Sequence, residues 1–281
     1  MSNPLILDGR VVAKSIELDL QKRVAFIKEK SGITPVLATI IVGNNPASET
    51  YVRMKGNACR RVGMEPLKVE LPESTTTDEL LAVIDKLNKD DSVCGILLQH
   101  PVPKHIDEQK CFNSISLEKD TDGVNVASFG SVTMGGKGFK CATPFSIMTI
   151  LNYYGIELKG KHAVVIGRSP ILGKPVSMLL LNADATVTIC HSRTTNLPEI
   201  VKTADVVVAC VGKANFVKRE WLKEGVVLVD AGYNEGNVGD IDLEACAPIS
   251  SAYTPVPGGV GPCTIAMLMT QTVESAERKY L

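Results

Sequence analysis

The strongest structural signal in the chain is the segment Val164-Val165-Ile166-Gly167-Arg168-Ser169-Pro170-Ile171-Leu172-Gly173-Lys174-Pro175. A buried strand is expected to end at Gly167, and a helix is expected to begin near Leu172. Backbone N–H groups and a helix N-terminus then meet where a pyrophosphate could bind. The pattern G-x-S-x-x-x-G is one residue longer than the G-x-G-x-x-G of dinucleotide-binding folds, so an ordinary strand-to-helix turn remains an alternative.

The residues after the next expected strand, Thr186–Cys190, indicate which dinucleotide is bound. Folds that bind NAD usually place Asp or Glu there, about 20 residues beyond the glycine motif, to hold the ribose hydroxyls. This chain instead has His191-Ser192-Arg193-Thr194. Arg193, Ser192 and Arg168 could bind a 2′-phosphate, which a carboxylate would repel. We therefore expect NADP, with a solvated basic loop as the alternative.

Short apolar runs alternate with helical patterns along the chain. The runs lack polar alternation, as expected of strands covered on both faces, and they are Val36–Val42, Val93–Leu98, Ala163–Gly167, Thr186–Cys190, Asp205–Cys210 and Val226–Asp230. The helical patterns include Gly9–Lys30, Ser48–Val62, Thr77–Asn88, Pro144–Tyr154 and Leu172–Asn182. Such alternation predicts an α/β fold with two parallel-sheet domains, the second a Rossmann-type NADP-binding fold.

A glycine-rich stretch, Gly130–Gly138, separates the two sets of strands. It contains four glycines in nine residues and little apolar content, so we predict a loop or hinge near a domain boundary. The first set spans about 1–120 and the second about 140–260. A final helix, Pro262–Tyr280, begins with a proline that suits a first turn.

Composition limits the classes of partner and compartment. The formal net charge of −1 over 281 residues gives no general attraction to nucleic acid or to an anionic membrane. We see no run of 18 apolar residues and no secretory signal, so a soluble, cytoplasmic protein is expected. None of the eight cysteines lies in a C-x-x-C pair, which favours buried thiols in a reducing compartment. A chain of this length needs neither a disulfide nor a metal for stability, and we predict no metal site.

Polar residues of the first half could converge on one site. Tyr51 and Lys55 are four residues apart, which is one turn along the same helix face. Gln99 directly follows the run Val93–Leu98, and Asp122 lies in the turn Asp120-Thr121-Asp122-Gly123. Each also has an ordinary interpretation: a solvated lysine, a hydrogen bonder at a strand end and a turn former. The Y-x-x-x-K spacing is typical of short-chain dehydrogenases, but there it follows the dinucleotide fold, whereas here it precedes it.

A second unusual stretch is Thr254-Pro255-Val256-Pro257-Gly258-Gly259-Val260-Gly261-Pro262. Three glycines between prolines make a stiff loop with an exposed backbone, which allows a flat ligand to approach closely. Further along the cofactor half, Val211-Gly212-Lys213 and Asp230–Asn234 follow buried strands at the edge where open α/β sheets bind ligands. Contacts from these two loops to a nicotinamide are therefore plausible.

Together these segments closely resemble the bifunctional methylenetetrahydrofolate dehydrogenase/methenyltetrahydrofolate cyclohydrolase family, over nearly the whole chain. The most specific segments are Asn45–Ser48 leading to Tyr51-Val52 and Lys55, Gly95–Gln99, Lys119–Gly123, Gly167–Ser169, Cys190–Thr194, and Thr254–Pro262 followed by Thr264. The resemblance implies a catalytic folate-binding domain of residues 1–120 plus 262–281 and an NADP-binding Rossmann domain of residues 121–261. Folate would lie in the cleft of a subunit that typically forms a homodimer.

The resemblance also implies roles for individual residues. Tyr51 would stack on the folate ring system, Asp122 would hydrogen-bond the pterin edge, and Gln99 would position Lys55 and tune its basicity. These four residues form the expected catalytic set. Further folate contacts are expected from Gly258, Gly259 and Pro262. The cofactor contacts are expected from Gly167, Arg168, Ser169, Gly173, Ser192, Arg193 and Tyr233.

The expected activity is oxidation of 5,10-methylenetetrahydrofolate with NADP, followed by hydrolysis of the methenyl product to 10-formyltetrahydrofolate, in one-carbon metabolism and purine biosynthesis. The partners are therefore tetrahydrofolate derivatives. Three alternatives stay open: a dehydrogenase without cyclohydrolase activity, a two-domain NADP dehydrogenase of another small acid such as the shikimate dehydrogenases, and a catalytically silent folate- or nucleotide-binding regulator.

Overall fold

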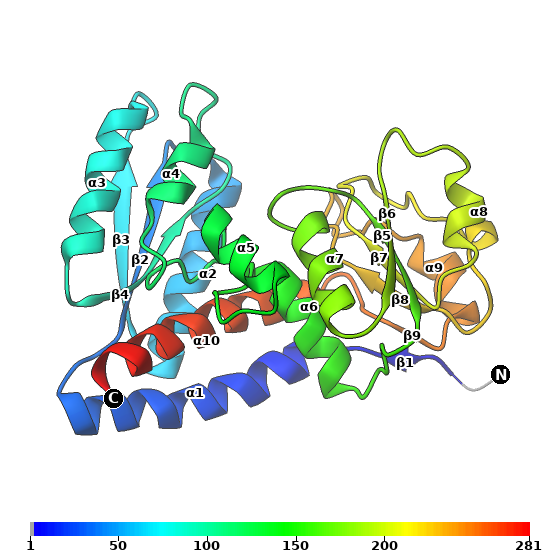
Figure 1. Ribbon diagram of the computed structural model, residues 1–281, viewed down its shortest axis with the longest axis horizontal. Coiled ribbons are helices and arrows are strands. Elements are labelled where there is room, and N and C mark those ends of the chain that lie inside the picture. Colours follow the sequence, from blue (N-terminus) through cyan, green and yellow to red (C-terminus); the bar gives the residue numbers. More distant parts are fainter. Residues whose placement is uncertain (1–2) are drawn as a thin grey trace. The chain divides into compact units, whose positions relative to one another are not determined.

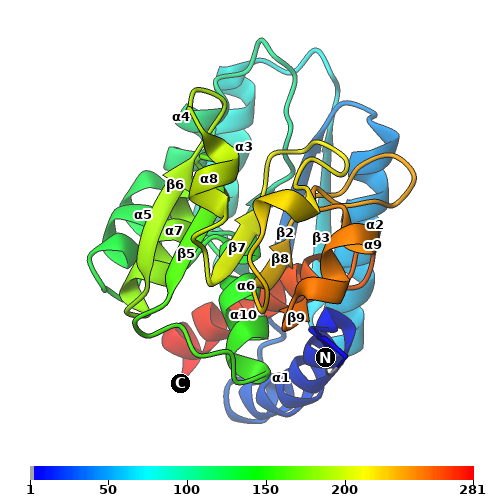
Figure 2. The same ribbon diagram turned by 90° about the vertical axis from the view of Figure 1, so that its right-hand side faces the viewer.

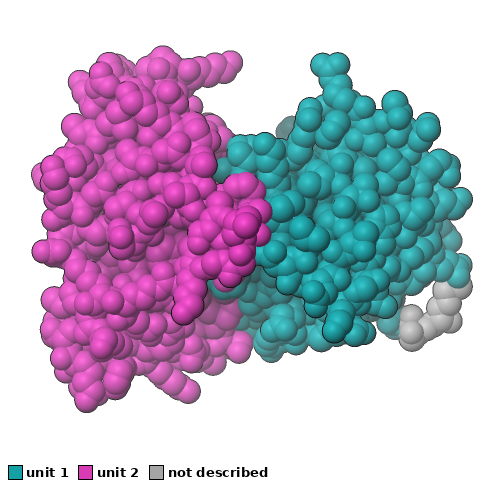
Figure 3. Space-filling view, viewed as in Figure 1, with its two compact units in different colours: residues 1–13, 143–264 teal, residues 14–142, 265–281 magenta. Residues whose placement is uncertain are grey.

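The computed structural model describes residues 3–281 and divides into two compact units, coloured separately in Figure 3. Unit 1 comprises the residues up to Ala13 together with Thr143–Thr264, and unit 2 comprises Lys14–Ala142 and Ile265–Leu281. Met1 and Ser2, which the predicted first domain included, lie outside the described residues. Both units contain parallel sheets, which confirms the predicted fold class.

Unit 2 is built on a three-stranded parallel sheet with the order β3-β2-β4. Its strands are β2 (Val36–Val42), β3 (Glu65–Leu71) and β4 (Val93–Leu98). One core packs on each face of the sheet: Leu37 and Leu97 point into the first, and Ile40 and Ile96 into the second. This arrangement explains why β2 and β4 are apolar without alternation, since both of their faces are covered.

Six helices surround this sheet or extend from it (Figure 1). They are α1 (Gly9–Ser31), α2 (Pro46–Val62), α3 (Thr77–Lys89), α4 (Glu108–Ser114), α5 (Val126–Thr133) and α10 (Val260–Tyr280). α3 shows why its sequence forms a helix: Thr76 and Glu79 make a capping box, which satisfies N–H groups at the first turn. The bounds between the units fall inside α1 and α10, so each of these helices runs from one unit into the other.

Unit 1 contains a six-stranded parallel sheet with the order β1-β9-β8-β7-β5-β6, part of which faces the viewer in Figure 2. The strands are β1 (Leu5–Ile6), β5 (His162–Ile166), β6 (Thr186–Cys190), β7 (Val206–Ala209), β8 (Val227–Asp230) and β9 (Ala252–Tyr253). Its helices are α6 (Ala142–Tyr153), α7 (Gly173–Asn182), α8 (Leu197–Val201) and α9 (Leu243–Cys246), with short 3-10 turns at Arg219–Trp221 and Ala247–Ile249. β5 and β7 are central and buried, whereas β6 is an edge strand with exposed positions.

The units have different bounds from the predicted domains. Residues 121–142 belong to unit 2, because the side chain of Gln271 on α10 hydrogen-bonds to Thr121 and Lys140. The first residues of the chain belong to unit 1, because β1 pairs with β9. The expected loop Gly130–Gly138 begins in the last turns of α5. Its last residues connect to α6, where the bound between the units falls.

Within residues 3–281, the longest helices carry too many charged or polar side chains for any of them to cross a lipid bilayer.

Candidate active site

The start of α2 is fixed by the residues that follow β2. Gly43 has a φ of +80° and turns the chain out of the sheet. The side chain of Asn45 accepts a hydrogen bond from the Ser48 N–H at 3.2 Å, and its carbonyl accepts one from Glu49 at 3.0 Å. α2 therefore begins at Pro46, at the carboxyl end of β2, and presents Tyr51 and Lys55 one turn apart on one side.

Lys55 and Gln99 meet in unit 2. The Lys55 amine donates a hydrogen bond to Gln99 Oε1 at 2.9 Å. Gln99 is 9% exposed and extends β4, because its N–H donates to the carbonyl of Ile40. Its Nε2 donates to the carbonyl of His100 at 2.7 Å. This second bond fixes the orientation of the amide, so that an oxygen and not an NH₂ group faces the amine of Lys55.

Asp122 completes this site electrostatically. Burial lowers the pKa of Lys55, and the negative charge of Asp122 partly opposes that effect. Burial likewise raises the pKa of Asp122, against the opposing influence of Lys55 and His100. In both groups the loss of hydration is the larger effect. The site therefore holds an acid and a base whose neutral forms are both more accessible than in water, which suits proton transfer.

The turn that carries Asp122 is held from both sides. The buried carboxyl of Asp120 accepts hydrogen bonds from the N–H groups of Val124 and Asn125, each at 3.0 Å. Gly123 has a φ of +66°, and a Cβ there would lie 2.3 Å from the carbonyl carbon of Lys140. Only glycine fits that position. Gln271, through the bonds described above, ties this turn to α10. Gln271 was not predicted, because one amide in an amphipathic helix has no recognisable pattern.

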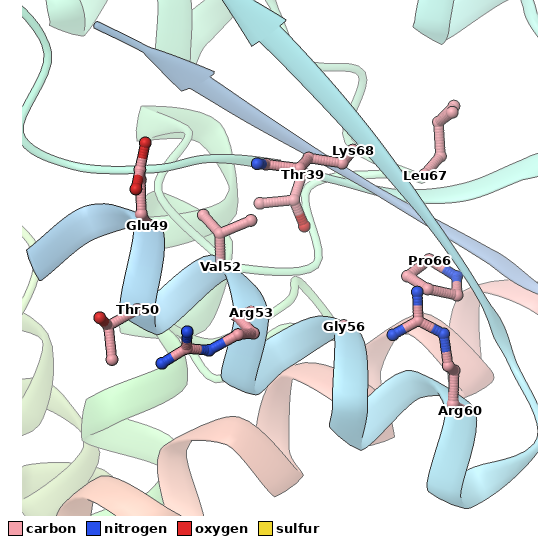
Figure 4. A pocket seen from close by; sticks show the side chains of 10 residues that line it. All are labelled: Thr39, Glu49, Thr50, Val52, Arg53, Gly56, Arg60, Pro66, Leu67 and Lys68. Carbon is pink, nitrogen blue, oxygen red and sulfur yellow. The ribbon is translucent and has the colours of Figure 1, made fainter. Parts of the chain in front are cut away.

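A surface hollow of about 350 Å³ lies on another side of α2 (Figure 4). It is lined by Thr39, Glu49, Thr50, Val52, Arg53, Gly56, Arg60, Pro66, Leu67 and Lys68. At 3.6 residues per turn, Arg53 and Arg60 project roughly opposite to Tyr51 and Lys55. The hollow is therefore separate from the site at Lys55.

In unit 1, the segment after β5 makes a close turn into α7. Gly167 has a φ of +136°, and a Cβ there would lie 2.4 Å from the carbonyl oxygen of Cys210. A Cβ at Gly173 would lie 2.4 Å from the carbonyl oxygen of Gly167. Ser169 Oγ accepts a bond from the Gly173 N–H at 3.3 Å. Leu172, the residue before α7, has no side chain that can cap the helix, and the N–H groups of Gly173 and Lys174 donate to Ser169 instead. The attraction of this N-terminus for an anion therefore comes from the dipole of α7.

The loop after β6 exposes basic and hydroxyl groups. The Thr194 hydroxyl accepts from the His191 N–H at 2.8 Å, and His191 Nδ1 accepts from the Arg193 N–H at 3.1 Å. These bonds close a tight turn with Ser192 and Arg193 exposed at its tip. Within residues 3–281, neither Arg193 nor Arg168 forms an ion pair with an acid, so both guanidinium groups are available to a phosphate.

The remaining predicted ligand residues also belong to unit 1. Tyr233 is 58% exposed in the loop after β8, and its hydroxyl donates to Asn237. Gly258 has a φ of +108°, and a Cβ at Gly259 would lie 2.5 Å from the carbonyl oxygen of Pro255. Pro262 falls in the first turn of α10. Unit 2 thus brings Lys55, Gln99 and Asp122 together, and Tyr51 lies on the same helix as Lys55. The glycine loop and the cofactor residues belong to unit 1.

The fold and these sites define a two-unit α/β enzyme with a Rossmann-type dinucleotide sheet. Residues 7–122 match the model of the tetrahydrofolate dehydrogenase/cyclohydrolase catalytic domain, and residues 141–280 match the NAD(P)-binding domain of the same family. The chain belongs to the tetrahydrofolate dehydrogenase/cyclohydrolase family, as the resemblance implied.

Relatives match over nearly the full length of the chain. The bifunctional protein FolD of Cellvibrio japonicus is 60% identical over 275 residues, which cover 98% of each chain. The crystal structure of the bifunctional FolD enzyme from Campylobacter jejuni has a TM-score of 0.96 at 44% identity and covers 98% of this chain and 99% of its own. The Trypanosoma brucei enzyme, solved with NADP cofactor and inhibitor, has a TM-score of 0.95 at 35% identity and covers 99% of both chains.

Proposed function

We propose that this chain oxidises 5,10-methylenetetrahydrofolate with NADP and then hydrolyses the methenyl product to 10-formyltetrahydrofolate. The observation that carries the proposal is the hydrogen bond between the Lys55 amine and Gln99 Oε1, beside Asp122, with a lowered lysine pKa. That site lies within the residues that match the family's catalytic domain. Folate would bind to unit 2 at Tyr51 and Asp122, with further contacts from Gly258, Gly259 and Pro262.

The residues of unit 1 fit an NADP molecule. The backbone around Gly167 and Gly173 leaves no room for a side chain, and the N-terminus of α7 follows directly, so a pyrophosphate could approach closely. Arg193, Ser192 and Arg168 would hold the 2′-phosphate, and Ser169 and Tyr233 would add contacts along the same edge of the sheet. When bound, NADP supplies a hydride acceptor.

The oxidation needs orientation more than acid–base chemistry. The methylene bridge of the substrate lies between two nitrogens and has iminium character, so it can lose a hydride without a side-chain base. Tyr51 would hold the ring system by stacking, and Asp122 would hold the pterin edge by hydrogen bonding. These contacts would set the methylene carbon in position, which supplies most of the rate enhancement.

The hydrolysis uses Lys55. Water adds to the electrophilic methenyl carbon and loses one proton. The bond from that carbon to one ring nitrogen then breaks, the nitrogen gains a proton, and the remaining hydroxyl proton leaves to solvent as the formyl C=O forms. An amine whose pKa is lowered by burial can accept the proton of the attacking water and deliver a proton to the leaving nitrogen. Gln99 would keep the lysine side chain directed into the site, because its own amide is fixed by the carbonyl of His100.

One assay on the purified chain tests the proposal. With methylenetetrahydrofolate and NADP, absorbance at 340 nm should rise as NADPH forms, and supplied methenyltetrahydrofolate should lose its absorbance faster than in buffer. NADPH formation without accelerated hydrolysis would leave a monofunctional dehydrogenase. Binding without either reaction would leave a silent regulator, and turnover of another small acid alone would leave a different dehydrogenase.

Two further proposals concern assembly and compartment. A homodimer, as the family resemblance implies, is supported by the outer edge of β3, where one row of backbone groups has no neighbouring strand within the described sheet. Light scattering after gel filtration should give twice the mass of 30.1 kDa. A reducing, cytoplasmic compartment is supported by the eight cysteines, which are thiols in the described chain and are mostly buried.

A further inference from the structure

Asp240 accepts hydrogen bonds from the backbone of a loop that lies far from it in sequence. Its side chain is fully buried in unit 1. The carboxylate accepts hydrogen bonds from three consecutive N–H groups after β7, those of Val211 at 2.6 Å, Gly212 at 2.9 Å and Lys213 at 2.9 Å. It also accepts one from Asn234 Nδ2 at 3.1 Å, in the loop after β8. One carboxylate thus connects two loops at the carboxyl edge of the sheet.

Asp230 in turn holds Asp240. It is the last residue of β8, and its buried carboxylate accepts bonds from the N–H groups of Gly232, Asp240 and Ile241 at 2.9, 2.9 and 2.7 Å. The backbone of Asp240 is therefore anchored to the end of a central strand while its side chain reaches the loop after β7. Bonds from N–H groups to a carboxylate are roughly twice as strong as those between neutral groups.

Two glycines make room for these carboxylates. A Cβ at Gly232 would lie 2.2 Å from Asp240 Oδ1, and a Cβ at Gly239 would lie 2.0 Å from Asp230 Oδ2. Neither position could carry a side chain without displacing a buried charge. The loop after β8 is therefore shaped around the two carboxylates, although its sequence resembles an ordinary flexible turn.

The position of these loops in the sheet indicates what they face. In the order β8-β7-β5-β6, the glycine turn follows β5 and the proposed 2′-phosphate site follows β6. The other half of a dinucleotide must then extend over β7 and β8. A contact supports this direction, because the carbonyl oxygen of Cys210 lies directly against Gly167. This step rests on the proposed function.

We propose that Asp240 is a positioning residue for the nicotinamide half of NADP. Because it draws the N–H groups of residues 211–213 inward, the carbonyl groups of the same peptides point away from it. The loop therefore offers hydrogen-bond acceptors, which match the NH₂ group of a carboxamide and not a phosphate. Asp240 itself does not touch the cofactor.

Two ligands separate this role from general stability. NADP contains the nicotinamide half, whereas adenosine 2′,5′-bisphosphate contains only the phosphorylated adenosine half. In titration calorimetry, Asp240→Asn should raise the Kd for NADP at least tenfold and leave the Kd for adenosine 2′,5′-bisphosphate within twofold of wild type. Arg193→Glu should weaken both ligands. The matched control is Asp242→Asn, two residues away, whose carboxylate pairs with Lys218 at 3.2 Å and which should change neither Kd.

The outcomes are distinct. Equal NADP affinity in Asp240→Asn and wild type, or equal weakening of both ligands, overturns the positioning role and leaves the proposed function intact. Failure of the wild type to bind NADP overturns the proposed function and the inference with it. If circular dichroism shows that Asp240→Asn is unfolded, Gly232→Ala takes its place. That variant keeps both charges but displaces the Asp240 carboxylate, and it should show the same selective loss of NADP affinity.

Discussion

Lys55 is held by one hydrogen bond and sits close to one counter-charge, which makes its proton affinity sensitive to single substitutions. Gln99 supplies the bond at 2.9 Å, and Asp122 supplies the charge. A neutral oxygen steers the amine without restoring the positive charge that burial disfavours. This combination is what a residue needs if it is to accept and return a proton within one turnover.

Replacing Lys55 by methionine should remove this proton path while keeping a side chain of similar length. We expect Lys55→Met to reduce the rate of methenyltetrahydrofolate hydrolysis at least 100-fold, within the range contributed by acid–base groups. The decrease in methenyl absorbance measures it. Arg53→Met is the control, since Arg53 lies on another side of α2 and should keep near wild-type hydrolysis. Unchanged hydrolysis in Lys55→Met would contradict the proposed role.

Arg193 should distinguish the two dinucleotides. Arg193→Glu replaces a side chain that donates hydrogen bonds to phosphate by one that repels phosphate. The KM for NADP should therefore rise at least tenfold, while the KM for the folate changes less than twofold. Initial rates at 340 nm with each substrate varied provide both values. Arg219→Glu, in the 3-10 turn before β8, is the matched charge reversal. A parallel rise in both KM values would count against phosphate recognition.

Individual site residues differed in how well the sequence predicted them. Lys55 and Gln99 come from two motifs 44 positions apart and are joined by a hydrogen bond. Their pairing was implied by the family resemblance, whereas the residues alone indicated only that Gln99 follows a strand and Lys55 lies on a helix. Asp240 and Gln271 had no such signal. Each acts through backbone groups of a distant segment, and backbone acceptors and donors leave no trace in side-chain patterns.

At the level of elements, the turn Asp120–Asn125 makes the free energy of unfolding depend on pH. Two N–H groups favour an ionised Asp120, but burial outweighs them and raises its pKa from 3.8 to about 7. The folded chain therefore binds more protons than the unfolded chain between these two pH values. The free energy of unfolding contributed by Asp120 must fall as the pH rises through that window.

Asp120→Asn should remove this dependence. From pH 4 to pH 7, the free energy of unfolding of the wild type should fall relative to that of Asp120→Asn by an amount of the order of 4 kcal/mol, at roughly 1.4 kcal/mol per pKa unit. Urea titrations at four pH values measure the two slopes. Parallel slopes would show that Asp120 does not titrate in this range.

Among the elements, apolar strands were predicted well and polar ones poorly. The bounds of β2 and β4 match the expected runs, since buried parallel strands select β-branched residues in uninterrupted series. The bounds of β6 match as well, but this edge strand has exposed positions and is not covered on both faces as expected. β3 was missed. Both β3 and β4 lie at an edge of their sheet, but only β3 has exposed charged residues, Glu65, Lys68 and Glu70, so its sequence lacks the apolar run that marked the others.

On the scale of the whole molecule, the two units keep separate cores but share two helices. Because α1 and α10 each continue from one unit into the other, neither unit can unfold without breaking a helix that the other uses. We expect one cooperative thermal transition. NADP at 100 times its Kd should stabilise the fold by about 2.7 kcal/mol, or about 5–10 °C for a chain of this size. Calorimetry measures it. Two separated transitions would contradict the single cooperative unfolding. An equal shift in Arg193→Glu would contradict stabilisation through bound NADP.

Gln271 has a consequence for a chain that has been cut. Its side-chain amide hydrogen-bonds to the backbone of Thr121 and of Lys140. The exposed backbone at Lys137, which lies between those two residues in the chain, is therefore not needed to hold them together. Brief trypsin treatment that cleaves after Lys137 should leave two fragments that separate on a denaturing gel yet elute together in native gel filtration. Gln271→Leu, which removes those hydrogen bonds, should let the nicked pieces drift apart in dilute urea. The two pieces would also keep the core in which Leu268 and Met269 pack with Leu20 and Leu97, so the fold does not depend on an unbroken backbone at this loop.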